Sequence, residues 1–283
     1  MTPLQARGPE AGSEDVWRMR KDRARRERDR LARITPVAAP NVVGASLTQA
    51  RCAAAVEDRD DVVDGLRGAA RWSAAALAAA DPGIAPASPG SAEVAPEIPL
   101  AAPFALGGLC GAMLLRDAPA LAVLAMPGAF ERNSARVKLG DVAVGHEAFW
   151  PLYGGLFAAV ARGETIEPAR IQACRDAVLS DEASAIDRAG LRAMKLPPIR
   201  LIELLSTYEP QVWAAALAGA VRAFNAFFDN PDWVALDTGM LALDISALCA
   251  IAHDRHGAPS DCGSPFIPAW LVAGAAEEPA VKE

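Results

Sequence analysis

Apolar side chains recur at offsets of three and four in two long segments near the carboxyl end of the chain. The first series is Trp213, Leu217, Ala220, Phe224 and Phe227, and the second is Leu241, Ile245, Leu248 and Ala252. This spacing places each series on one face of an α-helix. The second segment is apolar nearly all round, which is typical of a helix in the middle of a domain. Pro231 ends the first helix, and we expect the two helices to be neighbours, packed antiparallel.

The ends of the second helix can be located from its polar residues and its glycine. Asp237 or Thr238 can accept hydrogen bonds from the first free amides of a helix, and Gly257 can adopt the left-handed conformation that ends one. The segment 265–271 that follows is apolar but is too short and too rich in proline for a helix. We expect it to fold back over the helix pair as a clasp.

Similar periodicity and capping signals predict helices along most of the remaining chain. They cover residues 46–57, 60–80, 104–115, 118–126, 146–161, 167–179, 182–194 and 198–208, with a polar stretch at 130–141. Pro151 fits only the first turn of a helix, so its helix begins near Phe149 or is kinked. Sustained alternation of the strand type is missing from the sequence. The sequence therefore predicts an all-α fold, an irregular multi-helix bundle or stack of antiparallel helix pairs with about ten helices.

The distribution of proline and charge suggests the domain organisation. We expect a disordered amino terminus at residues 1–16, a basic helical arm at 17–35 and a single helical domain at 36–273. Within the domain, residues 82–103 contain six prolines and are predicted to form a long exposed loop. Residues 274–283 are expected to be a disordered tail.

Composition limits the compartment and the class of protein. Apolar residues make up 52% of the chain and charged residues 22%, which supports a globular fold. The five cysteines are odd in number and form no CxxC pair, which argues against a disulfide framework or a zinc module. The sequence shows no secretory signal and no apolar run near the roughly 18 residues that span a bilayer. We therefore expect a cytoplasmic protein that does not engage a membrane.

Residues 17–33 are rich in arginine. Residues 1–33 contain ten basic and six acidic groups, a net charge of +4, so the rest of the chain carries −11 to give the total of −7. Such a basic arm can neutralise the phosphates of a nucleic acid. Its acidic residues also stand three or four positions from arginines, as in a solvated helix with internal ion pairs. We favour the solvated helix and expect no nucleic acid partner.

Two groups of carboxylates are the candidate binding residues of the acidic part of the chain. One group lies at a predicted helix start, and the other surrounds the break between the two carboxyl-terminal helices. Their members are Glu57, Asp58, Asp60, Asp61, Asp64, Asp229, Asp232 and Asp237. Acidic side chains are favourable near the amino end of a helix, and they can also steer and bind a basic protein surface. The sequence leaves both interpretations open.

Several residue clusters were considered as metal or catalytic sites. Possible metal ligands gather at the end of the last long helix: His253, Asp254, His256 and Cys262. The favourable interaction of cationic side chains with a helix carboxyl end also explains the histidines, and we prefer it. His146 and Glu147 begin like a zinc-protease motif, but Trp150 stands where the second histidine belongs. We expect neither a metal nor a cofactor.

Asp244 places a carboxylate in an otherwise apolar helix, which is costly unless the carboxylate is paired. We prefer a structural hydrogen bond to an arginine or a helix end over general-acid catalysis, because no second catalytic group can be assigned. Cys249 is most simply a small core residue. We expect no enzymatic activity. The alternative is a hydrolase or transferase that uses Asp237, Asp244, Cys249 or His253.

Four segments of this chain stand out together: residues 64–72, Phe149–Trp150, 248–257 and 265–271. With the stretch around them, about residues 59–271, they resemble the immunity protein 49 family of bacterial polymorphic toxin systems. The resemblance implies an all-helical protein that binds a cognate toxin domain and blocks its active site or substrate path. The acidic body would suit a basic, nuclease-type toxin. A further alternative is a regulator that binds nucleic acid through residues 17–33, and the oligomeric state is left open.

Overall fold

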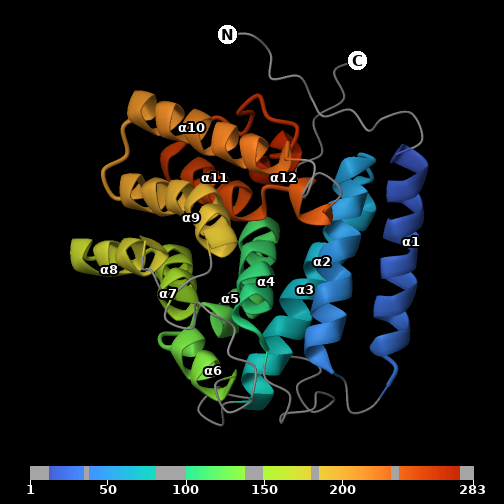
Figure 1. Cartoon of the computed structure of the whole chain (residues 1–283). Helices are drawn as coiled ribbons and strands as arrows, with labels where there is room; N and C mark the ends of the chain where they lie inside the picture. The colour runs from blue at the N-terminus through green and yellow to red at the C-terminus, as the bar shows by residue number, and fades with distance from the viewer. Residues whose placement is uncertain are drawn as a thin grey trace.

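The computed structural model describes residues 13–34, 38–80, 100–137, 149–179, 185–230 and 236–274 (Figure 1). The described residues form twelve α-helices and a short 3-10 turn, with no strand, so the predicted all-α class is confirmed. The helices in the first half are α1 (Ser13–Leu31), α2 (Ala39–Ala55), α3 (Arg59–Ala80), α4 (Ala102–Leu115), α5 (Ala118–Leu124) and α6 (Ala129–Val137). Those in the second half are α7 (Phe149–Arg162), α8 (Pro168–Leu179), α9 (Ala185–Leu205), α10 (Pro210–Phe228), the 3-10 turn η2 (Asp237–Gly239), α11 (Leu243–His256) and α12 (Ala269–Ala273).

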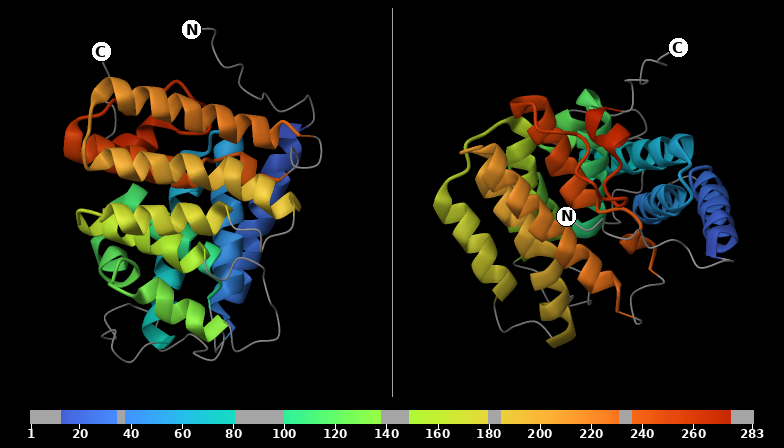
Figure 2. Two further views of the ribbon diagram at one scale, coloured as in Figure 1. Left: turned by 60° about the vertical axis from the view of Figure 1, so that its left-hand side comes forward. Right: turned by 90° about the horizontal axis from the view of Figure 1, so that it is seen from above.

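Helices α1, α2 and α3 lie side by side along one edge of the molecule (Figures 1 and 2). The α2–α3 pair is close because Gly65 faces the backbone of α2. A Cβ at Gly65 would lie 2.7 Å from the carbonyl oxygen of Ser46 and 2.8 Å from the amide nitrogen of Ala50. Neither backbone atom can move easily, so the crossing depends on glycine at this position.

Helix α4 connects the two halves of the structure, because it packs against α3 on one side and against α7 and α11 on the other. Apolar residues lie on every side of this helix, and Leu109, Cys110, Ala112 and Leu114 are completely buried. In the second half, α7 and α11 contact this central helix, α8 and α9 pack against α7 and each other, and α10 packs against α9. One continuous hydrophobic core therefore runs through both halves.

The amino terminus differs from the prediction. Disorder was expected to residue 16, but α1 begins at Ser13, and Trp17 is only 6% exposed. Helix α2 also begins earlier than expected, at Ala39, because Pro40 occupies the first turn, where its missing amide donor costs nothing. Residues 1–12, most of the predicted proline-rich loop and the tail from 275 lie outside the described residues.

Two predicted helix boundaries in the second half are wrong. Residues 182–194 and 198–208 were expected to form separate helices, yet α9 runs unbroken through Pro197 and Pro198. Ile199 and Ile202 remain buried after the prolines, so packing holds the helix where the missing amides weaken it. The stretch 130–141 was described only as polar and no helix was predicted there, but it contributes most of α6, whose Phe130 is buried.

The predicted pairing of the two carboxyl-terminal helices is also wrong. Helix α10 packs mainly along α9, and α11 packs against α4, α12 and α9 (Figure 2). Phe227 of α10 lies against Gly190 of α9, where a Cβ would sit 3.4 Å from the ring. The apolar stripe of α10 identified a buried face correctly, but it did not identify the helix that covers it.

The ends of α11 were predicted in part. Gly257 has φ of 66° and its amide donates to carbonyl groups of the last turn, as expected for a left-handed cap. Asp237 and Thr238 do not begin α11; they begin η2, and α11 starts at Leu243 without a side-chain cap. The segment after Gly257 folds back as expected: the Phe266 ring lies 5.6 Å from that of Phe224, and the Phe266 carbonyl accepts from the Ala242 amide. The expectation that it contains no helix is wrong, because the short helix α12 begins directly after Pro268.

Candidate functional site

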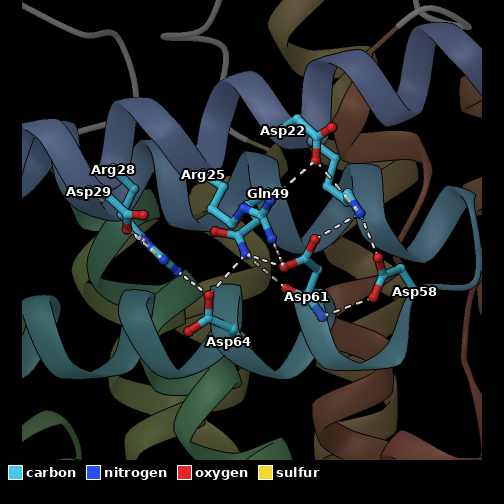
Figure 3. A network of polar contacts seen from close by, with 9 residues as sticks. Asp22, Arg25, Arg28, Asp29, Gln49, Asp58, Asp61 and Asp64 are labelled. Atoms are coloured by element: carbon cyan, nitrogen blue, oxygen red, sulfur yellow. Dashed lines mark hydrogen bonds and ion pairs between the residues drawn. The ribbon is translucent and has the colours of Figure 1, made fainter.

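The inner face of α1 carries three cationic side chains that point at α3. Lys21 Nζ lies 2.5 Å from Asp58 Oδ2 and 2.8 Å from Asp61 Oδ2. Arg28 Nη1 lies 2.7 Å from Asp64 Oδ2. We call this network the α1–α3 seam, and its members are Lys21, Arg25, Arg28, Gln49, Asp58, Asp61 and Asp64 (Figure 3).

Each of the two inner carboxylates of the seam has more than one partner. Asp61 Oδ1 also accepts from Arg25 Nη1 at 3.3 Å. Gln49 of α2 donates to both carboxylates, at 3.2 Å to Asp61 Oδ1 and 3.1 Å to Asp64 Oδ2. The amide of Gln49 therefore joins the two halves of the seam from the helix between them.

The partners in the seam favour the ionised form of the Asp58 and Asp64 carboxylates. The hydrogen bond from Lys21 is the main reason that the pKa of Asp58 lies below its usual range. Burial alone would raise the pKa of Asp64, but hydrogen bonds from Arg28 and Gln49 outweigh it and the net shift is downward. The same hydrogen bonds to Asp58 and Asp61 raise the pKa of Lys21 despite its burial.

The seam includes three carboxylates of the first predicted acidic group. Asp58, Asp61 and Asp64 were candidates for binding a basic partner, and the structure gives all three intramolecular cationic partners. Glu57 and Asp60 remain exposed, and neither side chain forms an ion pair or hydrogen bond with a described residue. Glu57 also has a positive φ of 56°, which turns the chain from α2 into α3.

The described members of the second predicted acidic group also differ in exposure and partners. Asp229 is exposed at the carboxyl end of α10. Asp237 is half-buried, with its Oδ2 3.6 Å from Arg51 Nη1 of α2. Asp232 lies outside the described residues. Asp237 therefore contributes to the contact between η2 and α2 rather than to an open acidic surface.

A second buried charge cluster lies between α7, α9 and α11. Lys195 Nζ of α9 is 2.6 Å from Asp244 Oδ2 of α11, and the Tyr153 hydroxyl of α7 donates to that oxygen at 2.9 Å. Lys195 Nζ also lies 5.1 Å from the ring centroid of Tyr153 and 5.5 Å from that of Trp150. We call Lys195, Asp244, Tyr153 and Trp150 the α7–α9–α11 centre.

The α7–α9–α11 centre shows how the Asp244 carboxylate is paired. The carboxylate is paired, as expected, but its cation is a lysine and not an arginine or a helix end. Burial, followed by the charge of Asp244, raises the pKa of Tyr153 well above its usual value, so the phenol stays protonated and donates. Two donors converge on Asp244, so the carboxylate acts as an acceptor within a closed structural cluster.

The histidines and cysteines of the predicted metal cluster are not brought together. His253 Nδ1 bonds to the carbonyl of Ala258 at 2.7 Å, and His256 Nε2 bonds to the carbonyl of Leu205 at 3.1 Å. The His256 ring also stacks on Tyr208, with centroids 4.5 Å apart. Within the described part of the chain, no group of three His, Cys, Asp or Glu side chains is placed to hold a metal ion.

Asp254, the remaining acidic member of that cluster, is bound by Arg116. The guanidinium donates to Asp254 Oδ1 at 2.8 Å and Oδ2 at 3.1 Å. Its other hydrogens reach the carbonyls of Leu271 and Val272 in α12. Arg116 therefore fixes the carboxyl-terminal helix to the ends of α4 and α11.

Cys249 and Cys262 form a pair of thiols that hydrogen-bond to each other. This hydrogen bond is the main cause that lowers the pKa of Cys262 and raises that of Cys249, and burial raises the latter further. Cys249 is buried, as expected for a core residue. Both thiols are free.

The partners that sequence reasoning missed are Lys21, Gln49, Tyr153 and Lys195. For Lys21 a signal existed, because Trp17, Lys21, Ala24 and Arg28 follow at offsets of four, three and four and so share one helix face with two apolar residues. For Lys195 the sequence holds no comparable signal, since its partner is 49 positions away.

No helix of the described chain combines the length and the apolar character that crossing a membrane requires. Comparison with protein families gave no match. Neither the curated proteins nor the solved structures contain a match. The residues of the chain itself therefore carry the functional inference.

Proposed function

We propose that the chain is an immunity protein that binds a cognate bacterial toxin domain in the cytoplasm and occludes its active site or substrate path. The resemblance of residues 248–257 and 265–271 to the immunity protein 49 family motivates this proposal. The all-helical architecture is consistent with it. Such a protein acts through its outer surface and needs no catalytic group of its own.

The proposal rests on one observation: each of the groups that an enzyme would need contacts a different partner elsewhere in the fold. Asp237 pairs with Arg51, Asp244 with Lys195 and Tyr153, and the Cys249 thiol with that of Cys262. His253 bonds to a backbone carbonyl. No hydrogen bond or ion pair within the described residues joins any two of these four groups. A catalytic arrangement requires such groups to converge, and their separation favours the binding function.

Within this proposal, Glu57 and Asp60 are the carboxylates best placed to meet a basic toxin. They are exposed at the start of α3, beside the seam but outside its ion pairs. Exposed charges of this kind accelerate association and set its salt dependence. Asp58, Asp61 and Asp64 serve the stability of the fold instead.

The test is co-purification of this chain with the product of the adjacent gene, together with growth of cells that express that product. We expect a stoichiometric complex and restored growth in the presence of the wild-type chain. An adjacent product that neither binds the chain nor harms the cell would overturn the proposed function.

A charge-reversal variant tests the surface separately. E57K/D60K should weaken the complex roughly tenfold or more at low salt and less at physiological salt, because exposed pairs are screened. The matched control is E167K/E209K, which makes the same change of net charge at exposed positions before α8 and α10. If the two variants bound the toxin with equal affinity, Glu57 and Asp60 would not belong to the interface, and the proposed immunity function would be unaffected.

A further inference from the structure

Helix α1 has a second charged face that the seam does not use. Arg23, Arg26 and Arg30 follow at offsets of three and four, which places them on one side of the helix, and Arg33 follows three positions later in the turn after Leu31. This side is opposite the buried face of Trp17, Lys21 and Ala24, and all four arginines are exposed. We call these four residues the arginine stripe.

The acidic residues of α1 do little to neutralise the stripe. Asp22 lies near Lys21 and Arg25, and Asp29 binds Arg28, so both belong to the side of the seam. Glu27 is the exception, because its carboxylate pairs with Arg30 at 2.6 Å. The side chains of Arg26 and Arg33 form no ion pair or hydrogen bond with any described residue. The stripe is therefore strongly positive on a chain whose total charge is −7.

The fold presents the stripe on a fixed helix at the edge of the molecule. Trp17, Ala24 and Lys21 are each less than a tenth exposed, and the seam ties α1 to α3. Figure 2 shows α2 and α3 on one side of α1 and no other helix beyond its outer side. At a rise of about 1.5 Å per residue, the stripe extends over about 15 Å.

We propose that the arginine stripe binds the phosphate backbone of a nucleic acid. Guanidinium groups present donors that match phosphate oxygens and remain charged at every physiological pH. A regular series of them along about 15 Å suits a partner whose charges are also regularly repeated. Binding of this kind reads the backbone and not the bases, so it is independent of base sequence.

The composition of the face distinguishes this partner from an acidic protein or a membrane. A stable protein interface has a desolvated core of aromatic or aliphatic anchors, and the outer face of α1 has none between Arg23 and Arg33. An interfacial membrane helix inserts its apolar face, but the apolar face of α1 is covered by α2. The exposed apolar residues Val16, Met19 and Ile34 lie only at the ends of the stripe.

This inference goes beyond the toxin-neutralising function and does not depend on it. It reverses the expectation, drawn from the sequence, that residues 17–33 are a solvated helix without a nucleic acid partner. Pairing accounts for Lys21, Arg25 and Arg28, although mostly through α3 and not within α1. It leaves the charge of Arg26 and Arg33 without a counterpart among the described side chains.

The test measures binding of the full chain to two fluorescent probes, a 25-base-pair DNA duplex and a 25-nucleotide single-stranded RNA of mixed sequence. Four phosphate contacts give a slope of about −3 in log K against log salt, so affinity should fall on the order of 100-fold between 50 and 200 mM salt. The variant R23Q/R26Q/R30Q/R33Q should lose most of this affinity and should flatten the slope to near zero. Which of the two probes binds more tightly identifies the strand form.

The matched control is R170Q/R192Q/R200Q/R222Q, which removes four exposed arginines from α8, α9 and α10 and gives the same net charge. It should bind both probes as the wild type does. Far-ultraviolet circular dichroism and urea unfolding of both variants would establish that they remain folded, as expected for outward-facing positions.

Three results would overturn the proposal. The first is the absence of saturable binding to either probe at 50 mM salt, and the second is an equal loss of probe affinity in the two quadruple variants. The third is stripe-dependent binding to a poly-glutamate peptide or to vesicles with anionic lipids in preference to both nucleic acids. The last result would assign the stripe to an acidic protein or to a membrane surface.

Discussion

The two charge clusters stabilise their carboxylates in different ways. In the α1–α3 seam, Asp61 has three partners and Asp64 has two, and the side chains of Asp58 and Asp64 are 35% and 47% exposed. In the α7–α9–α11 centre, one lysine and one phenol share one oxygen of Asp244, and the lysine and aspartate side chains are 16% and 19% exposed. In the seam, Asp58 and Asp64 reach water, and Asp61, whose side chain is only 10% exposed, has three partners. In the centre, Asp244 would keep only the neutral hydroxyl of Tyr153 if Lys195 were lost.

This difference shows that the stability lost when a cationic side chain is removed depends on the donors and the water that remain beside the carboxylate. A carboxylate that keeps a second donor, or that can be hydrated, loses only a fraction of its stabilisation. A carboxylate left unpaired in a closed site bears most of its desolvation penalty. The following predictions compare the two clusters on this basis.

The largest effect is expected for K195M in the centre. Removal of the ammonium leaves Asp244 with the Tyr153 hydroxyl as its remaining partner, and the free energy of unfolding should fall by about 3 kcal/mol. Urea denaturation at pH 7 measures the change. The double variant K195M/D244N removes both charges and should be more stable than K195M alone; a single variant within 1 kcal/mol of the wild type would show that water reaches the centre.

A smaller effect is expected for K21M and for R28M in the seam. Asp61 keeps Arg25 and Gln49 when Lys21 is lost, and Asp64 keeps Gln49 when Arg28 is lost, so each variant should lose about 1 to 2 kcal/mol. R23M on the outer face of α1 is the control, with an expected change within about 0.5 kcal/mol. If K21M cost as much as K195M, the redundancy of the seam would be refuted.

Acid titration distinguishes the clusters further. The pKa values of Asp58 and Asp64 are lower in the folded protein than in the unfolded chain, so their stabilisation is present above about pH 4. It is lost as pH falls through their folded values, because the unfolded state then binds more protons. The variant D58N/D64N should therefore show a shallower loss of unfolding free energy between pH 6 and pH 3, and an unchanged slope would contradict this assignment.

Alkaline titration reports on the centre. The pKa of Tyr153 is raised in the folded protein, so the contribution of the protonated phenol is complete below about pH 10 and is lost as pH rises beyond it. Y153F should lose about 1 kcal/mol at pH 7 and should decline less than the wild type between pH 9 and pH 11. Urea unfolding at each pH measures the two declines, and equal declines of Y153F and the wild type would contradict this assignment.

Periodicity and local chemistry were sufficient to predict the helices but not their partners. The left-handed cap at Gly257 was predicted, and a start of α7 near Phe149 was one of the two alternatives that Pro151 allowed, because each depends on backbone properties of the residue or its neighbours. The continuity of α9 was missed because packing of Ile199 and Ile202 overrides the local preference of Pro197 and Pro198. An apolar stripe shows that a face is buried, but α9, not α11, covers α10.

The charged residues illustrate the same limit more sharply. The sequence singled out Asp58, Asp61 and Asp64 by their density and Asp244 by its apolar surroundings. It did not reveal that their cations lie 36 or more positions away, because a charge carries no periodic signal that indicates its partner. The division of α1 into an inner and an outer basic face required the position of α3.

The separation of Lys21 from Asp58 along the chain also has a consequence for protein synthesis. Lys21 precedes Asp58 by 37 positions, which corresponds to about 2 to 7 seconds at ordinary rates of translation. During that interval the first helix emerges with every arginine unopposed by the third helix. The nascent chain is therefore polycationic before it becomes the acidic protein of the mature state.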